Sequence, residues 1–164
     1  MNGSALQTTA HQPMDAVETI TLEPRVLVGQ RQRVAVSELG DFFARAIPAV
    51  AGELARAGVH PLGPPIAMYQ HEQGHRFDVT VGFPVGEVPE FFGDLVREVL
   101  PGGPAVRAVH VGPYETLPAA YGELGHWFAQ RTLKVPEMMW EEYLVGPGDA
   151  DESAYRTEIV YPLS

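Results

Sequence analysis

The chain has 164 residues, 45% of them hydrophobic, and 21 acidic against 11 basic residues give it a formal net charge of −10. Its length and hydrophobic fraction suit a single folded domain with its own core. The acidic charge argues against nucleic-acid binding, and no apolar run reaches the roughly 18 residues of a membrane span. Because there is no cysteine, disulfides and thiolate metal sites are excluded, and we expect a cytoplasmic protein without metal or cofactor.

The first residues are predicted to stand apart from the domain. Residues 1–15 have neither a basic start nor an apolar run, so they are interpreted as a disordered leader and not as a signal peptide. The domain itself is expected to cover residues 16–164. So few residues precede the first predicted strand that we expect no DNA-binding domain ahead of it in this chain.

The first half of the chain alternates apolar and polar residues in four segments, which predicts strands, around one segment of helical period. The helix is expected to be capped at Ser37, kinked at Pro48 and ended by Gly58. A Gln73-Gly74 turn joins the last two strands into a hairpin. The predicted elements are strands over residues 17–22 and 25–34, a helix over 39–54, and strands over 66–71 and 76–85.

The second half repeats this order after an ambiguous segment. Residues 86–100 fit either a short helix or, from residue 95, a strand. We favour the strand, because Pro101-Gly102-Gly103-Pro104 makes a turn into the strand that follows. The predicted elements are strands over residues 95–100 and 105–111, a helix over 117–128, and strands over 137–145 and 154–162.

The recurrence of two strands, a helix and a hairpin indicates an internal repeat. Matching the two halves sets Ala67 against Glu141 and Tyr69 against Tyr143. Each half alone would expose its sheet, whereas joining them buries one sheet face under both helices. We therefore predict an α+β fold with two β-β-α-β-β units related by a pseudo-twofold axis. Its antiparallel sheet has about eight strands, two long helices cover one face, and a cleft lies along the axis.

Common catalytic and metal-binding motifs are absent. The chain has no phosphate-binding loop, no dinucleotide fingerprint and no serine nucleophile elbow. His71 and His75 are four residues apart, but they flank a turn at Gly74, so we interpret them as exposed turn residues. His110 and His126 are solitary. No metal site is predicted from these histidines.

The Trp140-Glu141-Glu142-Tyr143 segment is more informative. In a strand, Glu141 and Tyr143 point to one face, while Trp140 and Glu142 point to the other, so one glutamate must face the helices. A buried carboxylate without a partner is costly and is often functional, and neither neighbouring position, 139 or 143, is basic. The alternation leaves open which glutamate is buried, and also whether both lie in water on a surface strand.

Aromatic residues gather in the elements around the predicted cleft. A tyrosine keeps a polar tip, which suits a cavity wall, and rings around a carboxylate suit an organic cation at about 0.5–2 kcal/mol per contact. Trp140 belongs to the same aromatic set, although any single ring on a helix face is more often part of the core. The predicted ligand-binding residues are Glu141, Tyr143, Tyr69, Tyr114, Tyr121, Trp127 and Phe43.

Several short motifs, in this order and spacing, resemble the gyrase-inhibitor-like (GyrI-like) effector-binding domain. In the second half they are Gly112 to Leu117 (GPYETL), Tyr121 with Leu124 and Trp127, Trp140 to Leu144 (WEEYL), and Thr157 to Pro162. In the first half they are Gly63-Pro64-Pro65, Phe77-Asp78-Val79 and Gly82 to Val85. The similarity covers roughly residues 17–163.

The resemblance implies two strand–helix–strand–strand units about a pseudo-twofold axis. In that family the domain often follows a DNA-binding segment, so this chain resembles a stand-alone member. It also selects Glu141 over Glu142, because the family's ligand-site glutamate lies two residues before a tyrosine. Tyr114 matches another position that lines the family's cavity.

Three functions follow as hypotheses. The first is a multidrug-type protein that sequesters aromatic, often cationic, small molecules around Glu141. The second is a hydrolase that opens strained rings of toxic electrophiles, because some stand-alone members of the family resemble such enzymes. Glu141 would be the general base and Tyr114 the hydrogen-bond donor. The third, a gyrase-inhibitor-type interaction protein, has no residue here that points to a partner surface.

Overall fold

The computed structural model describes residues 17–74, 76–86 and 93–163, with the side chains of residues 71–73 left out. The expected leader over residues 1–15, His75 and the His71 side chain lie outside this description. The elements are β1 (Glu18–Leu22), β2 (Arg25–Ala35), η1 (Val36–Glu38), α2 (Leu39–Arg56), β3 (Ile66–Gln73), β4 (Arg76–Val85), β5 (Val96–Leu100), β6 (Gly103–Val111), η2 (Tyr114–Thr116), α3 (Leu117–Gln130), β7 (Met139–Val145), η3 (Glu152–Ala154) and β8 (Arg156–Pro162).

The predicted α+β class, the eight strands and both helices are confirmed, including the strand before residue 101. The expected cap at Ser37 is wrong, because Ser37 lies inside η1 and makes no capping hydrogen bond. The Glu38 carboxylate accepts the Ala35 backbone N–H at 2.7 Å in its place. Gly58 follows α2 with a positive φ of 73°, as the predicted helix end requires.

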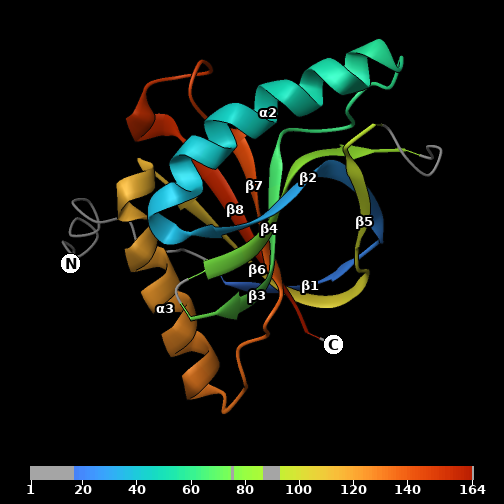
Figure 1. Cartoon of the computed structure of the whole chain (residues 1–164). Helices are drawn as coiled ribbons and strands as arrows, with labels where there is room; N and C mark the ends of the chain where they lie inside the picture. The colour runs from blue at the N-terminus through green and yellow to red at the C-terminus, as the bar shows by residue number, and fades with distance from the viewer. Residues whose placement is uncertain (1–16, 75, 87–92, 164) are drawn as a thin grey trace.

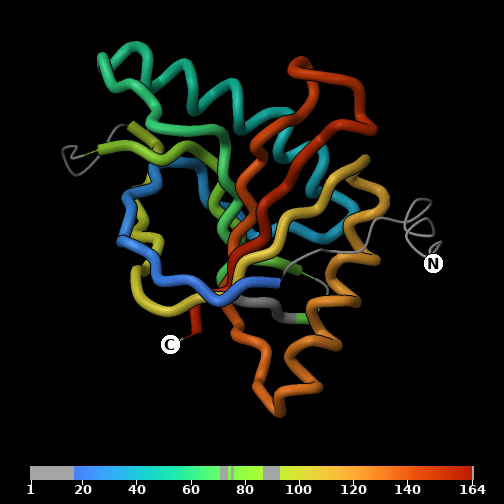
Figure 2. The backbone as a smooth tube through the Cα atoms, turned by 180° about the vertical axis from the view of Figure 1, so that it is seen from behind, coloured from blue at the N-terminus to red at the C-terminus, as the bar shows by residue number. Residues whose placement is uncertain are grey.

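The eight strands form one antiparallel sheet in the order β1-β6-β8-β7-β3-β4-β2-β5. The first strand of each half pairs with the other half: β1 pairs with β6, and β5 pairs with β2. This exchange, which the order of elements did not predict, ties the two repeats together at both outer edges. The sheet curls into a half-barrel, and α2 and α3 lie outside it (Figures 1 and 2). Neither described helix combines the length and apolar character needed to cross a membrane.

The pseudo-twofold axis passes between the central strands β3 and β7. Ala67 and Glu141, which correspond in the repeat, are also direct partners across these two antiparallel strands. Two equivalent residues can pair with each other in this way only where the axis runs between them. Glu141 therefore lies at the centre of the molecule, where both helices can contribute side chains.

The sheet buries side chains on both faces. On the outer face, α3 packs Leu124 and Phe128 against Ile159, and α2 packs Phe42 against Ala67. The inner face of the curl holds a separate cluster: Leu27, Ile66, Met68, Leu100, Ala105, Trp140 and Val160. Trp140 is 2% exposed and belongs to this inner cluster, on the opposite face of β7 from Glu141.

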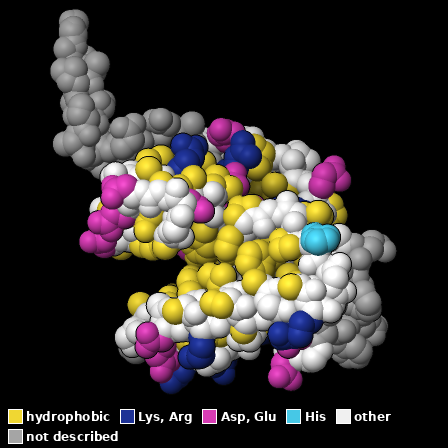
Figure 3. Space-filling view, turned by 90° about the horizontal axis from the view of Figure 1, so that it is seen from above, with side chains coloured by type: hydrophobic (Ala, Val, Ile, Leu, Met, Phe, Trp, Pro, Cys, Tyr) yellow, Lys and Arg dark blue, Asp and Glu magenta, His cyan; other side chains and the backbone are white. Residues whose placement is uncertain are grey.

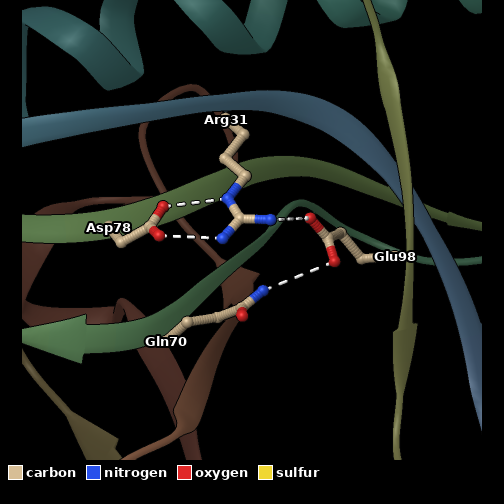
Figure 4. Close-up of polar contacts among 4 residues, drawn as sticks. All are labelled: Arg31, Gln70, Asp78 and Glu98. Carbon is tan, nitrogen blue, oxygen red and sulfur yellow. Dashed lines mark hydrogen bonds and ion pairs between the residues drawn. The ribbon is translucent and has the colours of Figure 1, made fainter.

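A charged cluster joins edge strand β5 to its neighbours (Figure 4). Arg31 on β2 donates two hydrogen bonds to Asp78 on β4, at 2.9 and 2.8 Å, and one to Glu98 on β5, at 3.1 Å. Gln70 on β3 donates to the other Glu98 oxygen at 3.4 Å. A fork-shaped guanidinium suits this bridging role better than a lysine would. The cluster thus links four strands at this end of the sheet.

Replacing Arg31 by methionine is expected to lower the free energy of unfolding by about 1 kcal/mol, and by less at high salt. The loss is modest because the Arg31 side chain is 41% exposed and solvent screens its charge. Urea denaturation at two salt concentrations measures the effect. Arg56→Met is the control, since Arg56 forms one exposed ion pair with Glu53. Equal losses in both variants would contradict a stabilising role for the Arg31 cluster.

Candidate functional site

Glu141 is a buried carboxylate under the two helices. It is 6% exposed, it lies on central strand β7, and its neighbours across the sheet are Ala67 and Ile159. Burial raises the pKa of its carboxyl group above the ordinary value. Within the described ranges, Glu141 forms no ion pair with an arginine, lysine or histidine. The site therefore holds a carboxyl group whose negative charge no cationic side chain of the described residues compensates.

Two tyrosine hydroxyls hold the Glu141 carboxylate. Tyr121 on α3 donates to Oε2, and Tyr143, two residues along β7, donates to Oε1 at 2.5 Å. These bonds favour the ionised form and lower the pKa of Glu141, but burial has the larger effect. Burial and the nearby carboxylate raise the pKa of both phenols well above 10.0, so they stay protonated and remain donors at neutral pH.

Further aromatic rings extend from this cluster toward the surface. The ring of Tyr143 lies 6.1 Å from that of Phe43 on α2 and 6.0 Å from that of Tyr114 on η2. Tyr114 lies 5.1 Å from Tyr155 and is 36% exposed. Seen from above α2, the surface is hollowed and lined mainly by hydrophobic side chains (Figure 3). The rings thus connect an exposed tyrosine to the buried carboxylate.

Most of the predicted ligand residues meet here. Tyr69 lies close enough to Glu141 for that carboxylate to raise its pKa, although burial contributes more. Trp127 is different: its described ring contacts are with Phe128 and with the Arg131 guanidinium, 4.0 Å from the ring centre. The structure therefore brings Glu141, Tyr143, Tyr69, Tyr114, Tyr121 and Phe43 together, and it places Trp127 with other partners.

Two tyrosines were missed by the sequence reasoning. The Tyr155 ring packs against that of Tyr114 at a tilt of 37°, and burial together with Glu141 raises the pKa of Tyr161 to about 12. Tyr161 lies two residues after Ile159, the partner of Glu141 on β8, so strand alternation could have placed it on the same face. Tyr155 precedes β8, where no such alternation applies.

Glu142 is also buried, at 7% exposure, but its charge is compensated. It faces the inner side of the curl, where Arg25 donates to its Oε1 at 2.9 Å. The alternative that both glutamates lie in water is wrong. Arg25 is 117 residues away in sequence, so the neighbouring positions of the strand could not reveal it. Of the two glutamates, only Glu141 lacks a cationic partner within the described ranges.

Other chemistry finds little support. Over the described ranges, no three His, Asp or Glu side chains cluster in a way that could hold a metal ion. His110 is buried, and its Nε2 lies 2.8 Å from the Thr116 hydroxyl. Burial lowers the pKa of His110, so the ring is neutral at physiological pH. The arrangement suits two roles for Glu141: a counter-ion for a bound cation, or a proton acceptor with a raised pKa.

Replacing Tyr121 by phenylalanine is expected to raise the pKa of Glu141 further, because one hydrogen-bond donor to the ionised carboxylate is lost. Carboxyl ¹³C chemical shifts followed against pH measure this change in glutamate-labelled protein, with Glu141→Gln used to assign the signal. Tyr155→Phe is the control, because its ring contacts Tyr114 and it forms no described hydrogen bond to Glu141. An unchanged pKa in Tyr121→Phe would show that this hydrogen bond does not stabilise the ionised carboxylate.

Solved structures share this fold at low sequence identity. The EcmrR C-terminal domain superposes with a TM-score of 0.74 at 22% identity, covering 91% of this chain and 97% of that domain. In an EcmrR–DNA complex the TM-score is 0.76 at 22% identity, and the match covers 90% of this chain but 56% of EcmrR. SAV2435 bound to tetraphenylphosphonium gives 0.69 at 15% identity, covering 91% of this chain and 94% of that one. No curated protein matches the chain.

The family of the chain follows from a family model, because structures of such low sequence identity show only the fold. That model describes the GyrI-like small molecule binding domain and matches residues 15–164, nearly the whole sequence. The matched range includes both repeats, both helices and the central strand with Glu141. On that match, the chain belongs to the GyrI-like family of small-molecule-binding domains.

Proposed function

We propose that this protein binds hydrophobic aromatic cations and that Glu141 is their counter-ion. The observation that carries the proposal is a buried carboxylate that accepts hydrogen bonds from two phenols but has no cationic partner among the described residues. Phenols stabilise a carboxylate without neutralising it, so the negative charge remains available. A cytoplasmic protein of this kind would sequester such compounds from the solution around it.

The energetics favour a cation over a neutral ligand. Transferring a carboxylate out of water is costly, and this cost shows as the raised pKa of Glu141. A cation placed beside it recovers part of that cost, because charges interact more strongly where water is excluded. The surrounding rings of Tyr143, Phe43 and Tyr114 add apolar contact and cation–π attraction.

Entry to the site requires side chains to move. Glu141 is almost fully buried and accepts a hydrogen bond from Tyr143, whose ring contacts those of Phe43 and Tyr114. Tyr114 is the most exposed of these rings, and it starts the short η2 helix, so it is the natural side chain to rotate first. A ligand would displace the Tyr114 and Tyr143 rings and replace their contacts with its own.

The comparisons support ligand binding in general. The family is a small-molecule-binding one, and SAV2435, which shares the fold, was solved with tetraphenylphosphonium. That compound is an aromatic cation of the chemistry that the site favours. It is therefore a suitable probe for this protein.

Titration calorimetry with tetraphenylphosphonium and with triphenylphosphine oxide tests the proposal. The second compound carries three phenyl rings but no net charge. We expect the cation to bind at least about tenfold more tightly, a difference of roughly 1.4 kcal/mol or more. Equal affinities would mean that the rings alone determine binding and that Glu141 is not a counter-ion.

A ring-opening hydrolase is the second candidate, and the raised pKa of Glu141 is the observation that favours it. A carboxylate of raised pKa is a better proton acceptor at neutral pH. The ring of Tyr114 lies 6.0 Å from that of Tyr143, and its hydroxyl would donate a hydrogen bond to a developing anion. A protein from Listeria innocua described as a hydrolase shares the fold, with a TM-score of 0.59 at 12% identity over 96% of both chains. Mass spectrometry with a cyclopropane-bearing alkylating agent tests this; turnover that is no faster than with Glu141→Gln would exclude it.

A further inference from the structure

The Tyr114 hydroxyl lies against the backbone of Gly146, the residue that follows β7. Gly146 is buried, and a Cβ atom added to it would lie 2.9 Å from the Tyr114 hydroxyl oxygen. That is closer than van der Waals contact allows. The end of the Tyr114 side chain therefore occupies the space that any side chain at position 146 would take.

The backbone of Gly146 is fixed by a turn of four residues, Gly146-Pro147-Gly148-Asp149. Its carbonyl accepts the Asp149 N–H at 2.9 Å, and its own N–H donates to Asp149 Oδ2 at 3.0 Å. Proline at the second position and a φ of 92° at Gly148 are typical of a type II turn. Tyr114, by contrast, is 36% exposed and can rotate. A side chain at position 146 would therefore displace Tyr114 and not the turn.

Tyr114 is also the exposed end of the rings that lead to Glu141. Its ring meets that of Tyr143 edge to face, with 6.0 Å between the ring centres and 74° between the planes. Tyr143 in turn donates to the Glu141 carboxylate at 2.5 Å. With its ring on Tyr143 and its hydroxyl on Gly146, Tyr114 is in a position that we call closed. A ligand that approached Glu141 along these rings would have to displace it.

We propose that Gly146 controls access to the Glu141 site, because its missing side chain allows Tyr114 to take the closed position. The proposal rests on the function proposed above, in which a cation reaches Glu141 by displacing Tyr114. A ligand that binds only the open protein has its apparent affinity reduced in proportion to the open fraction. Gly146 lowers that fraction, so it is a positioning residue that acts on the ligand through Tyr114. Alanine at position 146 crowds the closed position and raises the open fraction.

The closed position is tested first without ligand, in protein whose six tyrosines carry ring ¹³C labels. The neighbouring rings of Tyr143 and Tyr155 shift the NMR signals of Tyr114, which Tyr114→Phe assigns. In Gly146→Ala we expect these signals to move toward the values of a tyrosine in water. Gly125→Ala, whose added Cβ atom meets nothing within 4 Å, should leave them in place. Tyr114 signals that are the same in Gly146→Ala and in the parent protein would overturn the proposal.

The affinity for tetraphenylphosphonium is then measured by calorimetry. Gly146→Ala should bind it about fivefold more tightly than the parent does, because Tyr114 is already displaced in a larger fraction of the molecules. Phenylalanine at position 114 lacks the oxygen that the new Cβ atom would meet. Adding Gly146→Ala to Tyr114→Phe should therefore change the affinity by less than about twofold. An equal gain with and without the Tyr114 hydroxyl would overturn the proposal.

The two experiments separate this proposal from the function at Glu141. If tetraphenylphosphonium bound neither the parent nor Gly146→Ala while the Tyr114 signals moved, the function proposed at Glu141 would fail and the closed position of Tyr114 would stand. If the parent bound the cation but Gly146→Ala changed neither the signals nor the affinity, only the role of Gly146 would fail.

Discussion

Glutamine in place of Glu141 is expected to weaken tetraphenylphosphonium binding about 10- to 100-fold, which corresponds to roughly 1.4–2.8 kcal/mol. The amide keeps the shape of the side chain but removes the charge that the cation is proposed to meet. Without ligand, the variant should be at least as stable as the parent protein, because the buried, uncompensated carboxylate is gone. Calorimetric titration measures the affinity, and urea denaturation measures the stability.

The pH dependence gives this prediction a sign. The pKa of Glu141 in the folded protein lies above its ordinary value of 4.5, which applies to the unfolded chain. Its contribution to stability is therefore fully present below about pH 4.5 and is lost as the pH rises through the folded pKa. The stability of Glu141→Gln relative to the parent should increase over that range. Cation binding by the parent should strengthen over the same range, as Glu141 ionises.

Glu142→Gln is the matched control, because the two glutamates are adjacent on β7 but face opposite sides of the sheet. Removing the Glu142 charge leaves Arg25 without its partner and should lower stability. Tetraphenylphosphonium binding should not change. If both variants lost affinity equally, the effect would come from the strand as a whole and not from a counter-ion at Glu141.

Alanine at Gly82 is expected to lower the free energy of unfolding by more than about 4 kcal/mol, enough to prevent folding of a marginal domain. Gly82 and Gly29 are direct partners on β4 and β2, and a Cβ atom at Gly82 would lie 1.9 Å from the Val28 carbonyl oxygen. The obstacle is backbone, so no side-chain rotation can relieve it. Glycines at such positions allow close approach of two strands.

Gly125→Ala is the control for this substitution. Gly125 lies within α3, and an added Cβ atom would have nothing within 4 Å. Alanine there should stabilise the protein by about 1 kcal/mol, because it favours the helix. Circular dichroism and urea denaturation of both variants provide the comparison. A Gly82→Ala protein with the urea midpoint of the parent would show that β2 and β4 can separate at this point without cost.

The pattern of the elements could be predicted because it depends on local periodicity. Alternation identified the strands, and helical spacing identified α2 and α3. In each element the face that packs against the core stays the same along its length, so apolar residues recur with the period of the element. The ambiguous segment before residue 101 resolved as β5, which pairs with β2 of the first half. That exchange of first strands follows from the way in which the two repeats pack, which no local pattern carries.

The site divides in the same way. From the amino-acid sequence alone, β7 could be shown to present Glu141 and Tyr143 to one face and Glu142 to the other, because side-chain direction alternates along any strand. Whether each carboxylate has a partner depends on residues that are distant in sequence. Arg25 reaches Glu142 from β2, and Tyr121 reaches Glu141 from α3. Only the tertiary structure therefore decided that Arg25 neutralises Glu142, whereas Glu141 at the pseudo-twofold axis is held by phenols and meets no cation in the part of the chain that the structure describes.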